Sequence, residues 1–243
     1  MPVYALGDAI SRLNAEVLVE LAHTTAALQA AYQMRYQVYC LEHGFLVGQN
    51  GVERDEYDDH ARHAVVRWRQ TGEIIGTVRL ILPQTPAGDD DFPVQRICDP
   101  GLLRGLPLAT TGEVSRFALA KQQTKQVRGV SAETSSLLRL ALLRGALWLS
   151  AEAGHTHWLA VMQPTLLRLL RTSGLHFVPL GPLVEYHGLR QPVVADLAPT
   201  LARMAHEQPA VWNYLTQGGT WFSAPPLRSS LPRSSQVLQA LAA

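Results

Sequence analysis

Two charged side chains stand in an otherwise apolar, strand-like run at residues 112–120, which reads GEVSRFALA. Glu113 could take up a proton beside a ligand held by the cations that follow the strand. On a regular strand, alternation places Glu113 and Phe117 on one face and Arg116 on the other. A β-bulge, a feature that is common beside active sites, would be needed to bring both charges to one face. The run is therefore a candidate catalytic strand.

A basic segment separates this strand from a long helix predicted between residues 131 and 153. Lys121, Lys125 and Arg128, followed by Gly129, precede the N-terminus of that helix. Helix N-termini offer free N–H groups and the positive end of the helix dipole, and both favour anions. The segment is either an anion-binding site or simply a solvated basic loop.

A first helix is predicted over residues 24–42, because apolar residues recur there at spacings of three and four. Its buried stripe would comprise Ala27, Ala31, Met34, Val38 and Leu41. Arg35 lies on the flank of that stripe between Tyr32 and Tyr39. This position favours a stem packed on aromatic rings with the charged head in water.

An aperiodic segment between residues 44 and 63 is rich in carboxylates, including Asp55 and Asp58. It is either a solvated loop or a set of partners for a cationic group or a nearby arginine. One such arginine, Arg79, stands in the second strand of a hairpin predicted over residues 64–83. Buried in a sheet, Arg79 would need a carboxylate or an anionic ligand; at a sheet edge it would need neither.

The composition of the 243 residues, 47% apolar and 17% charged, is typical of a packed globular chain. A formal net charge of +1 gives no support for nucleic-acid binding, which needs a basic surplus. The most apolar stretch, residues 137–149, is interrupted by arginines and is too short to span a membrane. No signal peptide is recognised either, so a cytoplasmic location is expected. The two cysteines, Cys40 and Cys98, predict no disulfide framework or metal site.

Strands and helices alternate after residue 112. A strand at 157–162, a helix at 165–172 and further strands at 177–186 and 191–197 follow the long helix, which predicts an α/β sheet with a parallel pairing across that helix. Residues 1–219 are predicted to form one domain. Residues 220–243, rich in serine, proline and arginine, are predicted to form a loosely held tail.

Several of these pieces occur in a fixed order that resembles a known superfamily. They are Arg35 with Tyr39, Asp55-x-Tyr57-Asp58, Gly76-Thr-Val-Arg79-Leu and Glu113-x-x-Arg116-Phe117. The order resembles the autoinducer (acyl-homoserine-lactone) synthase branch of the GNAT acyltransferases. N-acyl amino acid synthases and the PEP-CTERM/exosortase system-associated acyltransferases are more similar still. The likeness to the last group runs from roughly residue 30 to residue 219 and includes His157-Trp158-Leu-Ala-Val-Met162 and Val184-Glu185-Tyr186-His187-Gly188-Leu-Arg190-Gln-Pro192.

The resemblance implies a fold and a reaction. The fold would be a GNAT-like three-layer α-β-α sandwich, whose central mixed, twisted sheet has splayed strands four and five, here residues 113–120 and 157–162. The reaction would move a fatty acyl group from acyl-phosphopantetheine to the amine of a small acceptor, an amino acid in the first place. The donor would be acyl carrier protein or CoA, and no cofactor would be bound permanently.

The resemblance also implies roles for individual residues. Glu113 would be the catalytic base, and Arg116 would order the site. The acceptor would be bound by Arg35, Tyr39, Asp55, Asp58 and Arg79. The donor would be bound by Phe117, Ala118, Lys121, Lys125, Arg128 and Gly129, and the three cations among these could also meet the acidic face of an acyl carrier protein.

Two departures from related patterns bear on the substrates. Autoinducer synthases carry a tryptophan shortly after the matched arginine, where this chain offers only Phe45, so an amino acid is favoured over S-adenosylmethionine. The glycine-rich diphosphate loop of acetyl-CoA enzymes is reduced to residues 126–129, which fits a carrier-protein donor. The alternatives are a synthase of the homoserine-lactone type using S-adenosylmethionine, and a non-catalytic module that binds acyl carrier protein.

Overall fold

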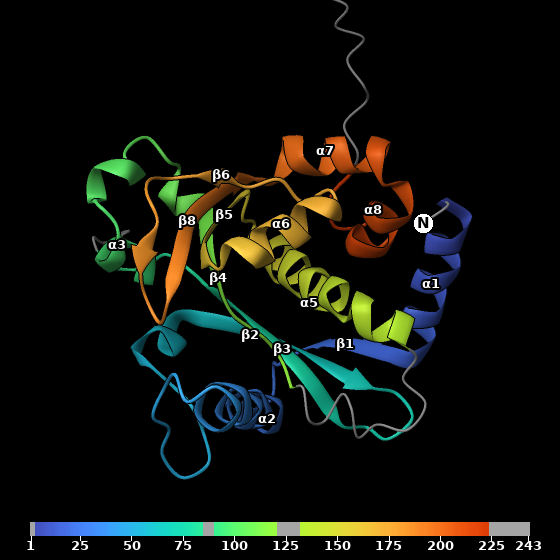
Figure 1. Ribbon diagram of the computed structural model, residues 1–243, viewed down its shortest axis with the longest axis horizontal. Coiled ribbons are helices and arrows are strands. Elements are labelled where there is room, and N and C mark those ends of the chain that lie inside the picture. Colours follow the sequence, from blue (N-terminus) through green and yellow to red (C-terminus); the bar gives the residue numbers. More distant parts are fainter. Residues whose placement is uncertain (1–2, 85–89, 121–131, 224–243) are drawn as a thin grey trace, which may run out of the picture.

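The computed structural model describes residues 3–84, 90–120 and 132–223. At its centre lies a twisted sheet in the order β1-β2-β3-β4-β5-β8-β6, with β7 paired to β8 off this path (Figure 1). The strands are β1 (Val17–Leu21), β2 (Ala61–Trp68), β3 (Ile74–Ile81), β4 (Thr111–Leu119), β5 (His157–Met162), β6 (Val178–Pro179), β7 (Val184–Glu185) and β8 (Leu189–Asp196). Paired strands are antiparallel, except that β4 and β5 are parallel.

Helices cover both faces of the sheet, which confirms the predicted GNAT-like three-layer α/β fold (Figure 1). The helix α2 (Thr25–Arg35) lies on one face, against β2, β3 and β4. The long helix α5 (Ala132–Ala153) lies on the other face, against β1 to β4. The helices that accompany α5 are α1 (Val3–Glu16), α6 (Pro164–Thr172), α7 (Leu197–Glu207) and α8 (Pro209–Thr216). A short helix, α3 (Pro93–Ile97), precedes β4.

The larger core lies between α5 and the sheet. Leu138, Leu142 and Leu147 of α5 are fully buried there and share one cluster with Val78 and Leu80 of β3. A Cβ atom added at Gly145 would lie 2.9 Å from the Cβ of Ala64. The absence of a side chain at that position therefore allows α5 to pack closely on the sheet. The nearly all-round apolar character of this helix is explained by its burial.

The first predicted helix changes its winding halfway. Thr24 caps α2 by accepting a hydrogen bond from the Ala27 N–H at 3.2 Å, and after Arg35 the chain continues as a π-helix, η1 (Tyr36–Glu42). The predicted stripe holds at Met34 and Val38, which are buried, but Leu41 is 60% exposed. The prediction for Leu41 was wrong because the wider π turns rotate later residues away from the stripe. Runs of π-helix occur frequently at functional sites.

The candidate catalytic strand, β4, carries the bulge that its charges require. Thr77 pairs with Ala118 and Arg79 pairs with Ser115, so β4 has one more residue than β3 between these two pairs. Arg116 sits in the bulge with a φ of 48°, a left-handed conformation that bulky residues rarely adopt. Past the bulge the alternation is shifted by one residue, so Phe117 packs with the α5-side core rather than sharing the face of Glu113. The regular alternation expected for Phe117 was therefore wrong.

The segment between α6 and β8 is more irregular than expected. The strand predicted over residues 177–186 is reduced to the two-residue strands β6 and β7. Both pair with β8, and β7 forms a tight hairpin with it, in which Val184 lies opposite Arg190. In the described ranges of the chain, none of the helices has the length and apolar character that crossing a membrane requires.

Candidate active site

The strands β4 and β5 separate in the middle of the sheet. They pair only at Thr111 with His157, Gly112 with Trp158, and Glu113 with Leu159. Beyond that point the two strands line a cavity of about 500 Å³, with Phe117 on one side and Ala160 on the other. The predicted splay of these two strands is therefore present, and it opens a space that is mostly apolar.

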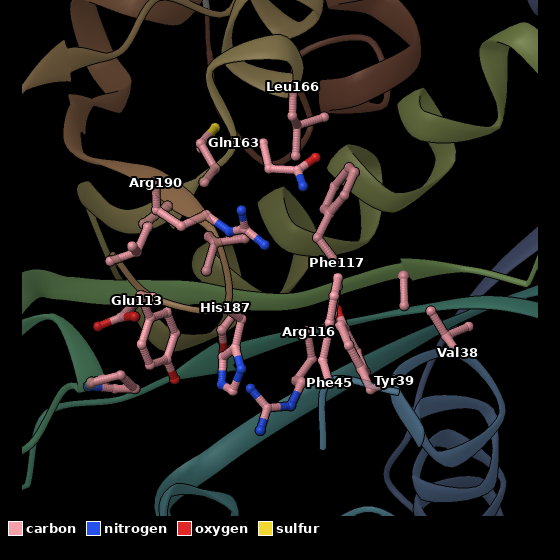
Figure 2. Close-up of a pocket in the computed structure, with 18 of the residues that line it drawn as sticks. Val38, Tyr39, Phe45, Glu113, Arg116, Phe117, Gln163, Leu166, His187 and Arg190 are labelled. Carbon is pink, nitrogen blue, oxygen red and sulfur yellow. The ribbon is translucent and has the colours of Figure 1, made fainter. Parts of the chain in front are cut away.

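Glu113 stands at the point where the two strands part, and it lines the cavity (Figure 2). The residue is 2% exposed, and its Oε2 accepts a hydrogen bond from the Val94 N–H at 2.9 Å. Burial raises the pKa of Glu113 to about 7, against a lowering by this hydrogen bond and by the more distant Arg79 and Arg116. A carboxyl group with a pKa near neutrality can both hold and release a proton at physiological pH.

Behind β4 lies a buried network of three arginines and three carboxylates, which we term the charge network: Arg35, Arg79, Arg116, Glu53, Asp55 and Asp58. Arg35 of α2 is fully buried; its Nε lies 2.6 Å from Glu53 Oε2, and its Nη1 lies 2.7 Å from Asp58 Oδ1. The sequence interpretation that placed the head of Arg35 in water was therefore wrong. The guanidinium is buried because it has two carboxylate partners.

The other two arginines complete the charge network. Arg79 of β3 donates to Ser115 Oγ at 2.9 Å, to Asp55 Oδ1 at 2.5 Å and to Asp58 Oδ1 at 2.8 Å. Arg116 donates to both oxygens of Glu53, at 2.9 and 2.8 Å, and to Asp55 Oδ2 at 2.8 Å. The bulge puts Arg116 on the face where these carboxylates lie, so its ion pairs offset the cost of the left-handed backbone.

Burial and ion pairing act in opposite directions on the carboxylates of the charge network. Burial would raise the pKa of Glu53, but hydrogen bonds from Arg116 and Arg35 outweigh it and lower the pKa to about 2. For Asp58, the contact with His63 and the hydrogen bonds from Arg35 likewise outweigh burial, and its pKa is lowered. Both carboxylates are therefore charged at neutral pH, and the arginines are balanced by them.

The acceptor-side residues named from the sequence fall into two groups. Tyr39 lines the cavity, and the guanidinium carbon of Arg116 lies 5.4 Å from the centre of its ring. Arg35, Asp58 and Arg79 are buried behind the strand and do not line the cavity. Asp55 also lies outside the lining, with a side chain that is 20% exposed. The structure thus brings all five together around Arg116, with Tyr39 and Arg116 at the cavity itself.

Two members of this region were not among the sequence candidates. Glu53 contacts both Arg35 and Arg116, and it lay unremarked within the acidic segment. His63 is 2% exposed, its Nε2 lies 3.4 Å from Asp58 Oδ1, and burial lowers its pKa. His63 is the residue just before the predicted hairpin, and the observed strand β2 extends back to include it, opposite Arg79.

The donor-side residues are described only in part. Phe117 and Ala118 both line the cavity, Phe117 packing toward α5 and Ala118 toward Met34 and Val38. Lys121, Lys125, Arg128 and Gly129 lie outside the described residues.

An aromatic wall closes one side of the cavity. It comprises Phe45, which follows η1, and Tyr186 and His187, which belong to the turn between β7 and β8. The ring of His187 lies 6.2 Å from that of Phe45 and 4.8 Å from that of Tyr186. Figure 2 shows Phe45 beside Arg116 and Tyr39, with His187 next to them. Two segments far apart in the sequence thus meet at the cavity.

Comparisons with known proteins agree with this geometry. Residues 34–129 match the family described as acetyltransferase (GNAT) domain. The structure of TofI is similar to this chain with a TM-score of 0.57 and 25% identity, over 81% of this chain and 99% of TofI. A search of curated proteins by sequence found no match.

Two further structures resemble the chain in fold. The CoA-dependent acyl-homoserine lactone synthase BjaI, with SAM and isopentyl-CoA, has a TM-score of 0.57 and 18% identity, over 83% of this chain and 88% of BjaI. FeeM, an N-acyl amino acid synthase from uncultured soil microbes, has a TM-score of 0.54 and 14% identity, over 78% of this chain and 97% of FeeM. The family match over residues 34–129 and these likenesses agree on a GNAT-type fold.

Proposed function

We propose that the protein is an acyltransferase that moves a fatty acyl group from acyl carrier protein, or from acyl-CoA, to the amine of an amino acid. One observation carries the proposal: a buried carboxyl group with a pKa near 7 stands where β4 and β5 part to form an apolar cavity. The cavity suits an acyl-pantetheine arm, and the carboxyl group suits an amine that must lose a proton. The sequence motifs shared with PEP-CTERM/exosortase system-associated acyltransferases support the same reaction class.

In the proposed reaction, Glu113 accepts a proton from the acceptor amine, directly or through a water molecule. The amine nitrogen then attacks the thioester carbonyl, so a C–N bond forms, the C–S bond breaks, and the pantetheine thiol takes up a proton. A positioned base of this kind contributes about 10²–10⁴-fold to the rate. Backbone N–H groups of β4 that face the gap would stabilise the negative charge on the carbonyl oxygen.

The charge network would hold Arg116 in place while Arg116 and Tyr39 meet the acceptor. Each guanidinium has at least two carboxylate partners. These ion pairs hold the bulge of β4 in place, and with it Arg116 in the lining of the cavity. We assign Arg35, Asp55, Asp58 and Arg79 to this support on the acceptor side, and Phe117 and Ala118 to the donor side. Lys121, Lys125, Arg128 and Gly129 are proposed to meet the phosphopantetheine and the acidic surface of the carrier protein.

The direct test incubates the purified protein with long-chain acyl carrier protein or acyl-CoA and each standard amino acid in turn. Mass spectrometry should detect an N-acyl amino acid, together with released holo-carrier or free CoA. Release of holo-carrier without an N-acyl product would contradict the proposal. Failure of both donors with every amino acid would contradict it as well.

A second acceptor, S-adenosylmethionine, is favoured by the likeness to BjaI, which was solved with that compound. The position where autoinducer synthases carry a tryptophan is held by Phe45, which stacks on His43 with ring centres 5.0 Å apart. Side-by-side assays with S-adenosylmethionine and the amino acids separate the two acceptors, because an acyl-homoserine lactone and an N-acyl amino acid differ in mass.

A further inference from the structure

The first residues of β8, which follow the turn from β7, bring a second arginine to the cavity. Arg190 is half-buried and lines the same cavity as Glu113 and Arg116. Figure 2 shows the guanidinium of Arg190 on one side of the β4 ribbon and Arg116 on the other. The two cations therefore approach the cavity from different directions.

Arg190 differs from Arg116 in the partners that it has. Both Nε and Nη2 of Arg116 are engaged by Glu53 and Asp55. Among the described residues, Arg190 donates a hydrogen bond only to the carbonyl oxygen of Leu189, 3.2 Å from its Nη1, and no carboxylate pairs with it. A guanidinium presents five donors in a planar fork that fits a carboxylate. Arg190 therefore has donors left for a ligand, whereas Arg116 has few.

The backbone around Arg190 is held in a defined shape. Glu185 Oε1 accepts from the Gly188 N–H at 2.9 Å, and the Tyr186 N–H donates to the Gly188 carbonyl at 3.0 Å. Gly188 has a φ of 91°, and a Cβ added there would lie 3.2 Å from Nη1 of Arg190. A glycine thus allows the turn and leaves space for the guanidinium, while the contact of His187 with Phe45 ties the turn to η1.

Strand pairing places Arg190 across the gap from Glu113. Glu113 pairs with Leu159, and Leu159 pairs with Val194, so Glu113 and Val194 lie in one row of the sheet. Arg190 precedes Val194 by four residues on β8, a shift of about 13 Å in the direction in which β4 runs from Glu113 to Phe117. Glu113 and Arg190 both line the one cavity, so an acceptor bound there would lie between the carboxyl group and the guanidinium.

We infer that Arg190 binds the α-carboxylate of the acceptor and so selects an α-amino acid over a simple amine. The inference rests on the proposed function and adds the residue that determines the acceptor class. The amine would lie toward Glu113 and the carboxylate toward Arg190, which would orient the nitrogen for attack on the thioester. The guanidinium would neutralise a charge that the apolar cavity otherwise disfavours.

Two pairs of acceptors test this role, each with and without the carboxylate: L-phenylalanine against phenethylamine, and glycine against methylamine. Binding is measured by calorimetry and turnover by mass spectrometry, using the full chain, Arg190→Gln, Arg190→Lys and the control Arg203→Gln. Arg203 is exposed on α7 and does not line the cavity. Binding needs no donor, so the result stands even if the protein transfers to neither acceptor.

Arg190→Gln should weaken binding of the amino acid that the protein prefers by about 10- to 100-fold, because one charged hydrogen-bonding group is lost. Binding of the matching amine and the KM for the acyl donor should stay within about twofold, and Arg190→Lys should restore part of the affinity. Equal losses for acid and amine, or a loss in the donor KM alone, would overturn the inference. So would equal binding of acid and amine by the unaltered protein. Absence of transfer by the unaltered protein with every amine would instead contradict the proposed function.

Discussion

Replacing Glu113 by glutamine should raise stability at neutral and alkaline pH while lowering activity. Glutamine has the shape of the protonated acid, and its Oε1 can still accept the hydrogen bond from the Val94 N–H. It does not have to be ionised in a buried site. Removing the charge therefore removes a cost that the folded protein carries for its function.

The size of the gain follows from the pKa. Burial raises the pKa of Glu113 from 4.5 to about 7, so the folded state binds this proton more tightly than the unfolded state does. Stability consequently falls as the pH rises from about 4.5 to 7, by about 1.4 kcal/mol per pH unit, which sums to about 3 kcal/mol above pH 7. Glu113→Gln should match the unaltered protein near pH 4.5 and exceed it by up to about 3 kcal/mol at pH 8.

Urea unfolding at pH 4.5, 6 and 8 measures this difference, with Glu207→Gln, an exposed position on α7, as the control. Turnover of the same variant should fall at least tenfold, and in the unaltered protein kcat/KM should rise with pH through about 7, where the base becomes ionised. A variant that is less stable at pH 8, or a stability difference that does not change with pH, would refute the assignment of a raised pKa. Unchanged turnover would remove Glu113 from the role of base.

Three further changes test the surroundings of the site. Glu53→Gln should lower the free energy of unfolding by about 3 kcal/mol at pH 7. Because only the charged form of Glu53 stabilises the fold, this deficit should shrink as the pH falls from 4.5 toward 2. Urea unfolding across that range measures the deficit, and a deficit that does not change with pH would contradict the ion pairs. Gly145→Ala should destabilise the protein by about 1–3 kcal/mol because the new methyl group meets Ala64. The control, Gly7→Ala in α1, has open space around it and should not destabilise the protein. Equal melting temperatures of the two variants would contradict the close packing of α5. Ala160→Phe should fill the gap between β4 and β5 and cut transfer of long acyl chains at least tenfold in a variant that still folds by circular dichroism; full activity would move the donor out of this cavity.

The sequence indicated the chemistry of β4 but not its geometry. Alternation alone put Glu113 and Arg116 on opposite faces, and only the alternative of a bulge allowed both on one face. The bulge forms because Arg116 finds Glu53 and Asp55 there, and those partners lie some sixty residues earlier in the chain. The periodicity of a short segment holds no information on ion pairs with residues far along the chain. For the same reason Arg35, whose carboxylate partners also lie in the later acidic segment, was expected at the surface.

The helical periodicity that predicted the first helix holds only as far as the α-helical winding. Met34 and Val38 are buried as expected, but the change to a π-helix exposes Leu41. The prediction that β4 and β5 splay apart came from the resemblance of motifs to a known superfamily, and no property of residues 157–162 predicted it. Arg190 lay within a motif singled out for its resemblance, and only the pairing of β8 with β5 brings it to the cavity.

The most direct test of the central proposal is mass spectrometry of the lipids that accumulate when the protein is overproduced, compared with the Glu113→Gln variant. We expect an N-acyl amino acid with the unaltered protein and at least tenfold less of it with the variant. The mass would identify the acyl chain and the amino acid together. Lipid profiles that do not differ between the two proteins, or accumulation of an acyl-homoserine lactone instead, would contradict the proposal.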